Sequence, residues 1–214
     1  MKKEDFYRYD MHIHTKYSSC SNISPSLILK KAAIKNLDGI AVTDHDTIRG
    51  ALEVLKLNKS KDFKVIVGEE VNTSIGHILV YNLNKEIKPS NIAEVLDEVK
   101  KQGAIACIAH PFATLRIKFK EDQNMKKIPC IETFNGRNSL HDNKKAEILA
   151  EKLKKAKIGG SDAHYLNEIG TGLTKFKGDF AQAVKKKQTI AYGTNNRIKT
   201  LFCKSRSGIR LLFH

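Results

Sequence analysis

The chain has 214 residues, of which 41% are hydrophobic, and this content excludes a disordered chain and allows a buried core. No segment approaches the roughly 18 uninterrupted apolar residues of a membrane helix, so no membrane span is expected. The basic N-terminal residues precede no apolar stretch, and the four cysteines are scattered, which favours a cytoplasmic protein with reduced thiols.

The charge is strongly positive. Lys and Arg number 38 against 23 Asp and Glu, a formal net charge of +15. Such a surplus favours polyanionic partners such as nucleic acid. Alternatively, the lysines simply coat helix faces, since their pairs are spread along segments with helical spacing. The composition leaves both readings open.

Strand-like apolar runs alternate with helical patterns along the chain. Strands are predicted around His12, then at 38–43, 63–70, 77–83, 104–110, 128–134, 157–162 and 189–193. Helices are predicted at 24–36 with Ser24 as cap, near Asp46, at 90–103 with Ser90 as cap and Gly103 as stop, and at 139–156. This alternation, without a linker, predicts one α/β domain over 1–214, with a parallel sheet or a barrel.

Polar residues gather where these strands end. His12 and His14 end the first, and later ends carry Asp44-His45, Glu69-Glu70, His110, and Asp162 with His164. In parallel α/β folds the carboxyl ends of the strands form the active site. Residues at i and i+2 of a strand project together, and two converging imidazoles suit a transition metal. Burying so many ionisable groups is costly without cations, so a metal cluster is predicted.

Six segments, in order, resemble the PHP (polymerase and histidinol phosphatase) domain family: "DMHIH", "TDHDT", "VGEEV", "GHILVY", "AHPF" and "GGSDAH". The resemblance covers about 10–167, and 168–214 would complete the domain. It implies a distorted seven-stranded (β/α) TIM-like barrel that holds two or three divalent metal ions, with Zn, Mn or Fe as candidates. It also implies that the metal ligands are His12, His14, Cys20, His45, Glu70, His77, His110, Asp162 and His164.

The same resemblance divides these ligands among the ions. His12, His14, Glu70 and Asp162 would hold one ion. Glu70 would bridge to a second ion, which His77 and His110 complete. Cys20, His45 and His164 would hold a third. Catalytic roles are implied for Asp162, Glu70 and His164.

One ligand position departs from the family pattern. Cys20 stands where many members have Asp or His. A thiolate is a good zinc ligand and would favour zinc over manganese. The alternative is that Cys20 is an ordinary loop residue, with Ser19 or water in its place. The family register favours Glu70 as the ligand and leaves Glu69 facing away.

Several neighbours have two interpretations each. Asp44 either orients a ligand or caps the following helix, and Asp10 either pairs with a ligand histidine or only begins the strand. Arg137, at the end of a strand, is a candidate clamp for phosphate, and Arg116 is a weaker one. Either arginine is otherwise an ordinary surface residue.

These features predict a hydrolase for phosphate esters, in which neighbouring metal ions generate a bridging hydroxide near neutral pH. The resemblance is greatest to stand-alone nucleotide phosphatases and 5′-to-3′ exonucleases, so the expected substrate is a nucleotide or a short single-stranded RNA or DNA with a 5′-phosphate. The alternatives are a histidinol-phosphatase-type enzyme, a non-catalytic RNA-binding subunit and an amidohydrolase.

Overall fold

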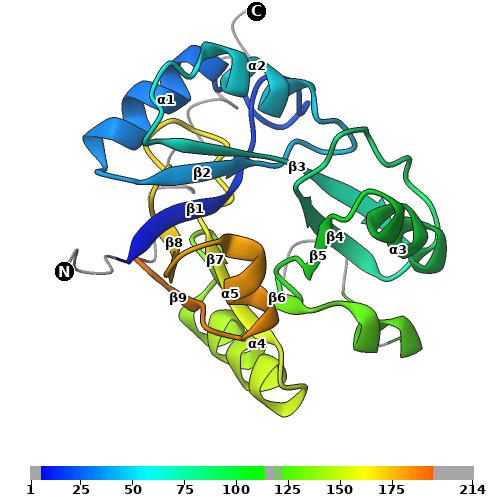
Figure 1. Ribbon diagram of the computed structural model, residues 1–214. Coiled ribbons are helices and arrows are strands. Elements are labelled where there is room, and N and C mark those ends of the chain that lie inside the picture. Colours follow the sequence, from blue (N-terminus) through cyan, green and yellow to red (C-terminus); the bar gives the residue numbers. More distant parts are fainter. Residues whose placement is uncertain (1–5, 114–118, 120–121, 195–214) are drawn as a thin grey trace, which may run out of the picture.

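The computed structural model describes residues 6–113, 119 and 122–194, which form an α/β fold around one curved sheet (Figure 1). In this part of the chain nine strands pair in the order β7-β6-β5-β4-β3-β2-β1-β8-β9. They are β1 (Tyr7–Ile13), β2 (Gly39–Val42), β3 (Lys64–Thr73), β4 (Gly76–Tyr81), β5 (Ile105–Ile108), β6 (Cys130–Asn135), β7 (Ala156–Gly160), β8 (Gly172–Phe176) and β9 (Ile190–Gly193). β1 to β3 are mutually parallel, as are β5 to β7, and β4 runs antiparallel between the two sets.

The sheet curls into a nearly closed barrel. At one end, the backbone N–H of His14, just after β1, donates to the carbonyl of Ala163, just after β7. Farther down, β8 pairs antiparallel with β1, and the Thr174 hydroxyl bonds to the backbone of Gly159 in β7 at 2.8 Å. These contacts bring β1 and β7 together, so that the carboxyl ends of the parallel strands surround one opening.

Helices cover the outside of the barrel. They are α1 (Pro25–Ile34), α2 (Arg49–Leu57), α3 (Ile92–Lys101), the 3₁₀ helix η1 (Gln123–Lys127), α4 (Leu140–Lys152) and α5 (Phe180–Lys185). The start of α3 is fixed by Asn91, whose side chain accepts from the Glu94 N–H, and α4 is capped in the same way by Ser139. Gly103, with φ of 63°, ends α3.

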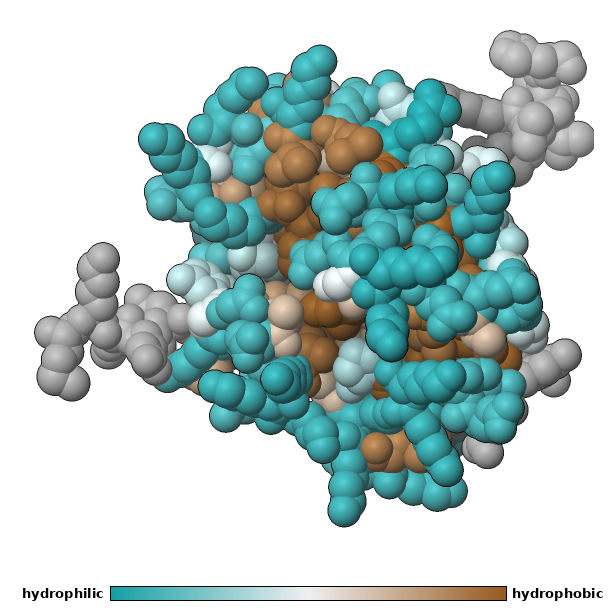
Figure 2. All heavy atoms as spheres, turned by 45° about the vertical axis from the view of Figure 1, so that its right-hand side comes forward, coloured by the Kyte–Doolittle hydropathy of each residue, from teal (hydrophilic) through white to brown (hydrophobic). Residues whose placement is uncertain are grey.

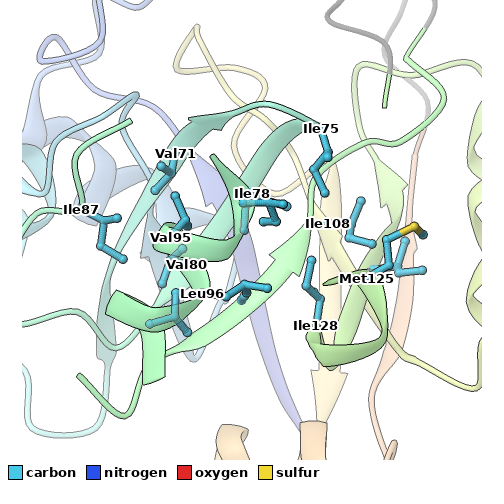
Figure 3. Packing of buried hydrophobic residues seen from close by; sticks show 14 of the residues in the cluster. Val71, Ile75, Ile78, Val80, Ile87, Val95, Leu96, Ile108, Met125 and Ile128 are labelled. Carbon is cyan, nitrogen blue, oxygen red and sulfur yellow. The ribbon is translucent and has the colours of Figure 1, made fainter. Parts of the chain in front are cut away.

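The core lies on both faces of the sheet. Met11, Leu79 and Tyr81 are among the fully buried side chains of a cluster from β1, β4 and neighbouring strands. On another face, aliphatic residues of β3, β4 and β5 pack against α3 and η1, as Figure 3 shows for Ile78 and Leu96. Packing on several sides makes the strands a rigid support for the residues at their ends.

The predicted fold class is confirmed, with differences in the number of strands and in the ends of two helices. The described sheet has nine strands instead of seven, because β8 and β9 continue the sheet beyond β1. β8 was not predicted, since "GLTKF" begins with glycine and mixes Thr and Lys with its apolar residues. The cap of α3 is Asn91, one residue after the predicted Ser90, and α4 ends at Lys152, before the predicted limit of 156.

No helix in the described part of the chain has the length and apolar character needed to cross a bilayer. The face shown in Figure 2 is dominated by hydrophilic side chains, and apolar surface is visible between them.

Candidate metal centre

Histidine and carboxylate side chains from six strand ends meet at the open end of the barrel. The parallel strands contribute the residues at or after their carboxyl ends. β4 runs the opposite way and contributes His77 from its beginning. Four overlapping groups have ligand atoms within 4.8 Å of one another: His14, Cys20, His45 and His164; His12, His110 and Asp162; His12, His14 and Glu70; and His45, Glu70 and His77. The structure therefore brings all nine predicted ligand residues into one cluster.

The ring orientations of His12 and His14 leave one nitrogen of each facing the centre of the cluster. Nδ1 of His12 lies 2.9 Å from a Glu132 oxygen, which can only accept a hydrogen bond when ionised, so Nδ1 carries a proton and donates it. Nδ1 of His14 is 3.1 Å from Oγ of Ser18. The two Nε2 atoms are then 3.1 Å apart.

This arrangement tests whether metal ions fit. Two imidazole lone pairs at 3.1 Å repel unless a cation lies beside them. Burial alone would lower the pKa of His12, but the carboxylates of Glu132, Asp162 and Glu70 outweigh burial and raise this pKa well above its usual value. The same field that holds a proton at Nε2 favours a divalent ion, and nitrogen and carboxylate oxygen are common ligands of Zn and Mn. The donor set fits the predicted ions.

Glu70 is the hub of the cluster. Its Oε1 lies 2.8 Å from both Nδ1 of His77 and Nε2 of His110, and its Oε2 lies 3.2 Å and 3.1 Å from the Nε2 atoms of His12 and His14. Burial would raise the pKa of Glu70, but the charge of His12 and the hydrogen bonds from His110, His12 and His14 hold it well below its usual range. An ionised carboxylate with two differently surrounded oxygens suits a bridge between two ions.

Glu69 lies on the same strand but takes no part in the cluster. Its Oε2 accepts the N–H of Ile87, and burial raises its pKa to about 8. The structure therefore places Glu70 in the cluster and Glu69 outside it, in the arrangement that the family register predicts.

The group formed by His14, Cys20, His45 and His164 lies nearer the solvent than the others. Nδ1 of His164 donates to the carbonyl of Asp162 at 2.8 Å, which leaves Nε2 as the lone-pair nitrogen. Burial, followed by the charge of His14, lowers the pKa of His164 to about 2, and burial lowers that of His45 to about 4. Neutral imidazoles are the form that binds metal. Cys20 is the exposed member of this group.

A buried carboxylate that the sequence reasoning missed supports the centre. Glu132, on β6, accepts from Nδ1 of His12 through one oxygen and from the backbone N–H of His110 through the other, at 2.9 Å and 2.8 Å. Asn135 donates to Glu132 and to Asp162, at 3.0 Å in both cases. Polar residues at 132 and 135 inside the apolar run "CIETFN" were the available signal.

Asp44 holds the loop after β1. Its carboxylate accepts from the backbone N–H of Thr15 and the hydroxyl of Ser18, both at 2.6 Å. Because Ser18 donates to Asp44, its oxygen is left to accept from Nδ1 of His14 and from the N–H of His45. Asp44 therefore orients a ligand through Ser18, and it does not cap α2, whose N-cap is Ile48.

Asp10 is hydrogen-bonded to the backbone and does not contact the ligand rings. It accepts from the backbone N–H groups of Ser161, Gly170 and His12, and from no histidine ring in the described residues. It therefore joins β1 to the segment after β7, and this contact holds two ligand-bearing segments in register.

Special backbone positions occur beside the metal-binding residues, and Gly160 allows the close approach of β7 and β1. A Cβ on Gly160 would collide with Cβ of His12, so only glycine fits there without displacing that side chain. Asp162 and His110 adopt left-handed backbone conformations, with φ of 55° and 23°. Such conformations are uncommon in non-glycine residues and occur preferentially at functional sites.

Arg137 lies beside the cluster. Its side chain is 8% exposed and its Nε is 3.9 Å from a Glu168 oxygen. Burial and the charge of His14 lower the pKa of His164, the carboxylate of Asp162 raises it, and the charge of Arg137 also lowers it, which places the guanidinium near that ligand. The other candidate clamp, Arg116, lies outside the described residues.

Cys20→Ser tests whether the thiol is a ligand. We expect the variant to lose about one equivalent of zinc, because a hydroxyl is a poorer zinc ligand than a thiolate. Cys20→Asp should keep this ion when the protein is loaded with manganese, which prefers oxygen. Elemental analysis after dialysis measures both. Zinc content in Cys20→Ser equal to that of the wild type would show that Cys20 is not a ligand, and Ser19→Ala tests in the same way the alternative that Ser19 takes its place.

Comparisons with known proteins agree with this geometry. The family model "PHP domain" matches residues 10–209. An uncharacterized protein of Methanocaldococcus jannaschii is 36% identical over 179 residues, which is 79% of this chain and 70% of that protein. The PolC-type DNA polymerase III of Latilactobacillus sakei is 33% identical over 122 residues, or 56% of this chain and 8% of the polymerase.

A solved structure shares the fold. It is that of a two-domain protein from Bacteroides vulgatus containing a predicted PHP-like metal-dependent phosphoesterase, with a TM-score of 0.75 at 19% identity, over 89% of this chain and 65% of that chain. The family match takes in almost the whole sequence and every residue of the cluster. The chain therefore belongs to the PHP domain family.

Proposed function

We propose that the protein is a metal-dependent phosphoesterase. The observation that carries this proposal is the convergence of four ligand groups, two of them sharing Glu70, at the carboxyl ends of the barrel strands. Bound divalent ions would supply Lewis acidity, which lowers the pKa of water and offsets the charge of a phosphoryl group. The Bacteroides protein, described as containing a predicted PHP-like metal-dependent phosphoesterase, supports the same class.

The chain's own residues would hold the ions and orient them. His12, His14 and Glu70 form the buried floor, with Glu132 and Ser18 fixing the ring orientations behind them. His45 and His77 are partly exposed and Cys20 is exposed, so this side of the cluster faces the solvent from which a substrate enters. A buried floor with one open side suits hydrolysis of a phosphate group at the end of a molecule.

Within this class we propose that the substrate is a nucleotide or a short single-stranded RNA or DNA with a 5′-phosphate. The net charge of +15 favours a polyanion, and a relative over about half of the chain is a DNA polymerase. On the loop after β1, Tyr17 lies beneath the guanidinium of Arg49 at 4.8 Å and near the amine of Lys16. An aromatic ring and cations are features that nucleic-acid sites use.

A side-by-side rate measurement tests both levels of the proposal. The substrates are a 5′-phosphorylated oligonucleotide, a nucleoside monophosphate and histidinol phosphate, each assayed with zinc, manganese or iron. We expect release of mononucleotides from the 5′ end and weaker action on the monophosphate. Faster turnover of histidinol phosphate by about a hundredfold, or 3 kcal/mol, would overturn the nucleic-acid substrate. Absence of any phosphate-ester hydrolysis in metal-loaded protein would overturn the class.

Arg137→Ala tests the phosphate clamp. Hydrogen bonds to charged groups contribute roughly 1.5–3 kcal/mol, so KM should rise by about tenfold to a hundredfold with a smaller change in kcat. Arg137→Lys should recover part of this loss, because lysine keeps the positive charge but cannot form the paired hydrogen bonds of a guanidinium group. Arg8→Ala, at the beginning of β1, is the control for removing an arginine away from the metal centre. Unchanged KM in Arg137→Ala would leave Arg137 as a structural partner of Glu168.

A further inference from the structure

The opposite end of the barrel carries a hollow that the proposed reaction does not use. It has a volume of about 850 Å³ and lies at the beginnings of β5, β6 and β7 and the last turns of α3 and α5. His110 and Asp162 follow the other ends of β5 and β7, so the hollow and the metal centre are separated by the length of the barrel. We call it the basal groove.

The floor of the basal groove is aliphatic. Ala104, Ile105, Pro129, Leu153 and Ala181 line it, and all five side chains are partly exposed to solvent. No aromatic residue and no arginine is among the described residues that line it. An aliphatic surface of this kind gains free energy when an apolar side chain covers it.

The rim of the basal groove is strongly positive. Six lysines and a single carboxylate, Asp97, line it; the lysines are Lys100, Lys127, Lys154, Lys155, Lys185 and Lys187. Among the described residues these six have no acidic ion-pair partner, whereas Lys101, Lys144 and Lys157 elsewhere on the surface all have one. Burial, and to a smaller extent the charge of Lys187, lowers the pKa of Lys155.

Helix dipoles explain part of this pattern. Lys100 and Lys185 occupy the last turns of α3 and α5, where a cation is favourable by about 0.3–1 kcal/mol. The dipoles do not explain why aliphatic surface remains exposed between the lysines. Like charges around an apolar hollow repel one another, and an anionic partner would relieve that repulsion.

The groove is longer than one small molecule requires. A second hollow, of about 560 Å³, continues from it across Leu153 and Lys155 toward η1 and adds two lysines and one carboxylate, Lys126, Lys152 and Asp122. Single ligand pockets have volumes of about 300–1,000 Å³, so the two together suit a longer segment of polypeptide. Figure 2 turns forward the side of the molecule that carries α3, where apolar surface is seen between hydrophilic side chains.

We propose that the basal groove binds an acidic segment of a partner protein, with apolar side chains on the aliphatic floor and carboxylates against the lysine rim. The chain's own last twenty residues do not match, because residues 195–214 contain five Lys and Arg and no Asp or Glu. A second copy that docked through its own basal groove would bring lysine against lysine. A nucleic acid would satisfy the rim, but it would place phosphates over an aliphatic floor that offers no ring for stacking.

The probe is a fluorescent acidic peptide of about 18 residues, long enough to form a helix, with Leu at i, i+3, i+4 and i+7 and Glu elsewhere. Two competitors accompany it: a scrambled peptide of the same composition, and a single-stranded oligonucleotide of the same charge. We expect saturable binding of the amphipathic peptide, measured by fluorescence anisotropy, and at least about tenfold weaker binding of the scrambled one.

Matched charge reversals locate the site. The groove variant combines Lys100→Glu, Lys127→Glu and Lys185→Glu. The control combines Lys31→Glu, Lys56→Glu and Lys59→Glu, which make the same change in net charge at and just after the ends of α1 and α2. We expect the groove variant to bind the peptide at least about tenfold more weakly, and the control to change binding by less than about twofold.

A third variant tests the floor and keeps folding separate from binding. Ala181→Glu places a carboxylate on the partly exposed first turn of α5, where an acidic residue is favourable for the helix, and it should also weaken peptide binding. Circular dichroism and metal content of all variants should match those of the wild type. Equal losses in both triple variants, equal binding of the scrambled peptide, stronger binding of the oligonucleotide at this groove, or no peptide binding at low salt would each overturn the proposal.

Discussion

Glu70→Gln should abolish hydrolysis and remove at least one equivalent of metal. The carboxylate lies against five histidines, two on Oε1 and three on Oε2, and a glutamine offers one acceptor and one donor in the same place. Lewis-acid stabilisation is worth several kcal/mol, and each 1.4 kcal/mol changes the rate about tenfold, so a loss of roughly a thousandfold or more is expected. Elemental analysis and a generic phosphodiester assay measure the two effects.

The chain supplies a closely matched control for this variant. Glu69→Gln makes the same change one residue earlier on β3, at a side chain that is equally buried but lies outside the cluster. The raised pKa of about 8 keeps Glu69 protonated near neutral pH, and glutamine can still accept the Ile87 N–H. We expect its metal content and activity to stay close to those of the wild type. Equal metal content in both variants would contradict the hub role of Glu70.

How far the sequence predicts this site depends on where its residues lie. His12 and His14 share a strand face, and Asp162 and His164 follow another strand at the same spacing, so a period of two and the strand ends predict their convergence. Cys20 belongs to a loop. Its place beside His14, His45 and His164 depends on how that loop folds back over the strand ends, which the sequence alone does not specify.

Other features were not predicted from the sequence, because they depend on tertiary contacts. β8 has no clear apolar alternation, and it is a strand because β1 offers it an unpaired edge. The net charge of +15 also says nothing about where the positive residues lie on the surface. Eight lysines line the two joined hollows at the far end of the barrel, so part of the surplus that favoured a polyanionic substrate lies away from the metal centre. Net charge gives the total field, and the fold decides where it acts.

The supporting carboxylate leads to the other prediction with a large effect. Glu132 sits inside an apolar run on β6 and touches no predicted ion site directly, yet it determines which nitrogen of His12 faces the cluster. We expect Glu132→Gln to weaken metal binding by about tenfold to a hundredfold, the range for residues that orient a ligand from behind. Competition with a chromophoric chelator measures this affinity directly, apart from any assay of hydrolysis.

The reason lies in the hydrogen bonds on both sides of Glu132. One oxygen accepts from His12, and the other accepts from the His110 N–H and from Asn135, so every contact is with a donor. Glutamine must present its amide N–H₂ to one of these sides, where donor meets donor. If the amide faces His12, the ring is driven toward the tautomer with a proton on Nε2, and the lone pair turns away from the ion. A variant that unfolds would lose metal as well, so thermal unfolding of the metal-free protein is measured beside the affinity. Weaker metal binding with an intact fold supports the orienting role, and unchanged metal affinity would show that the ring of His12 is held by its packing alone.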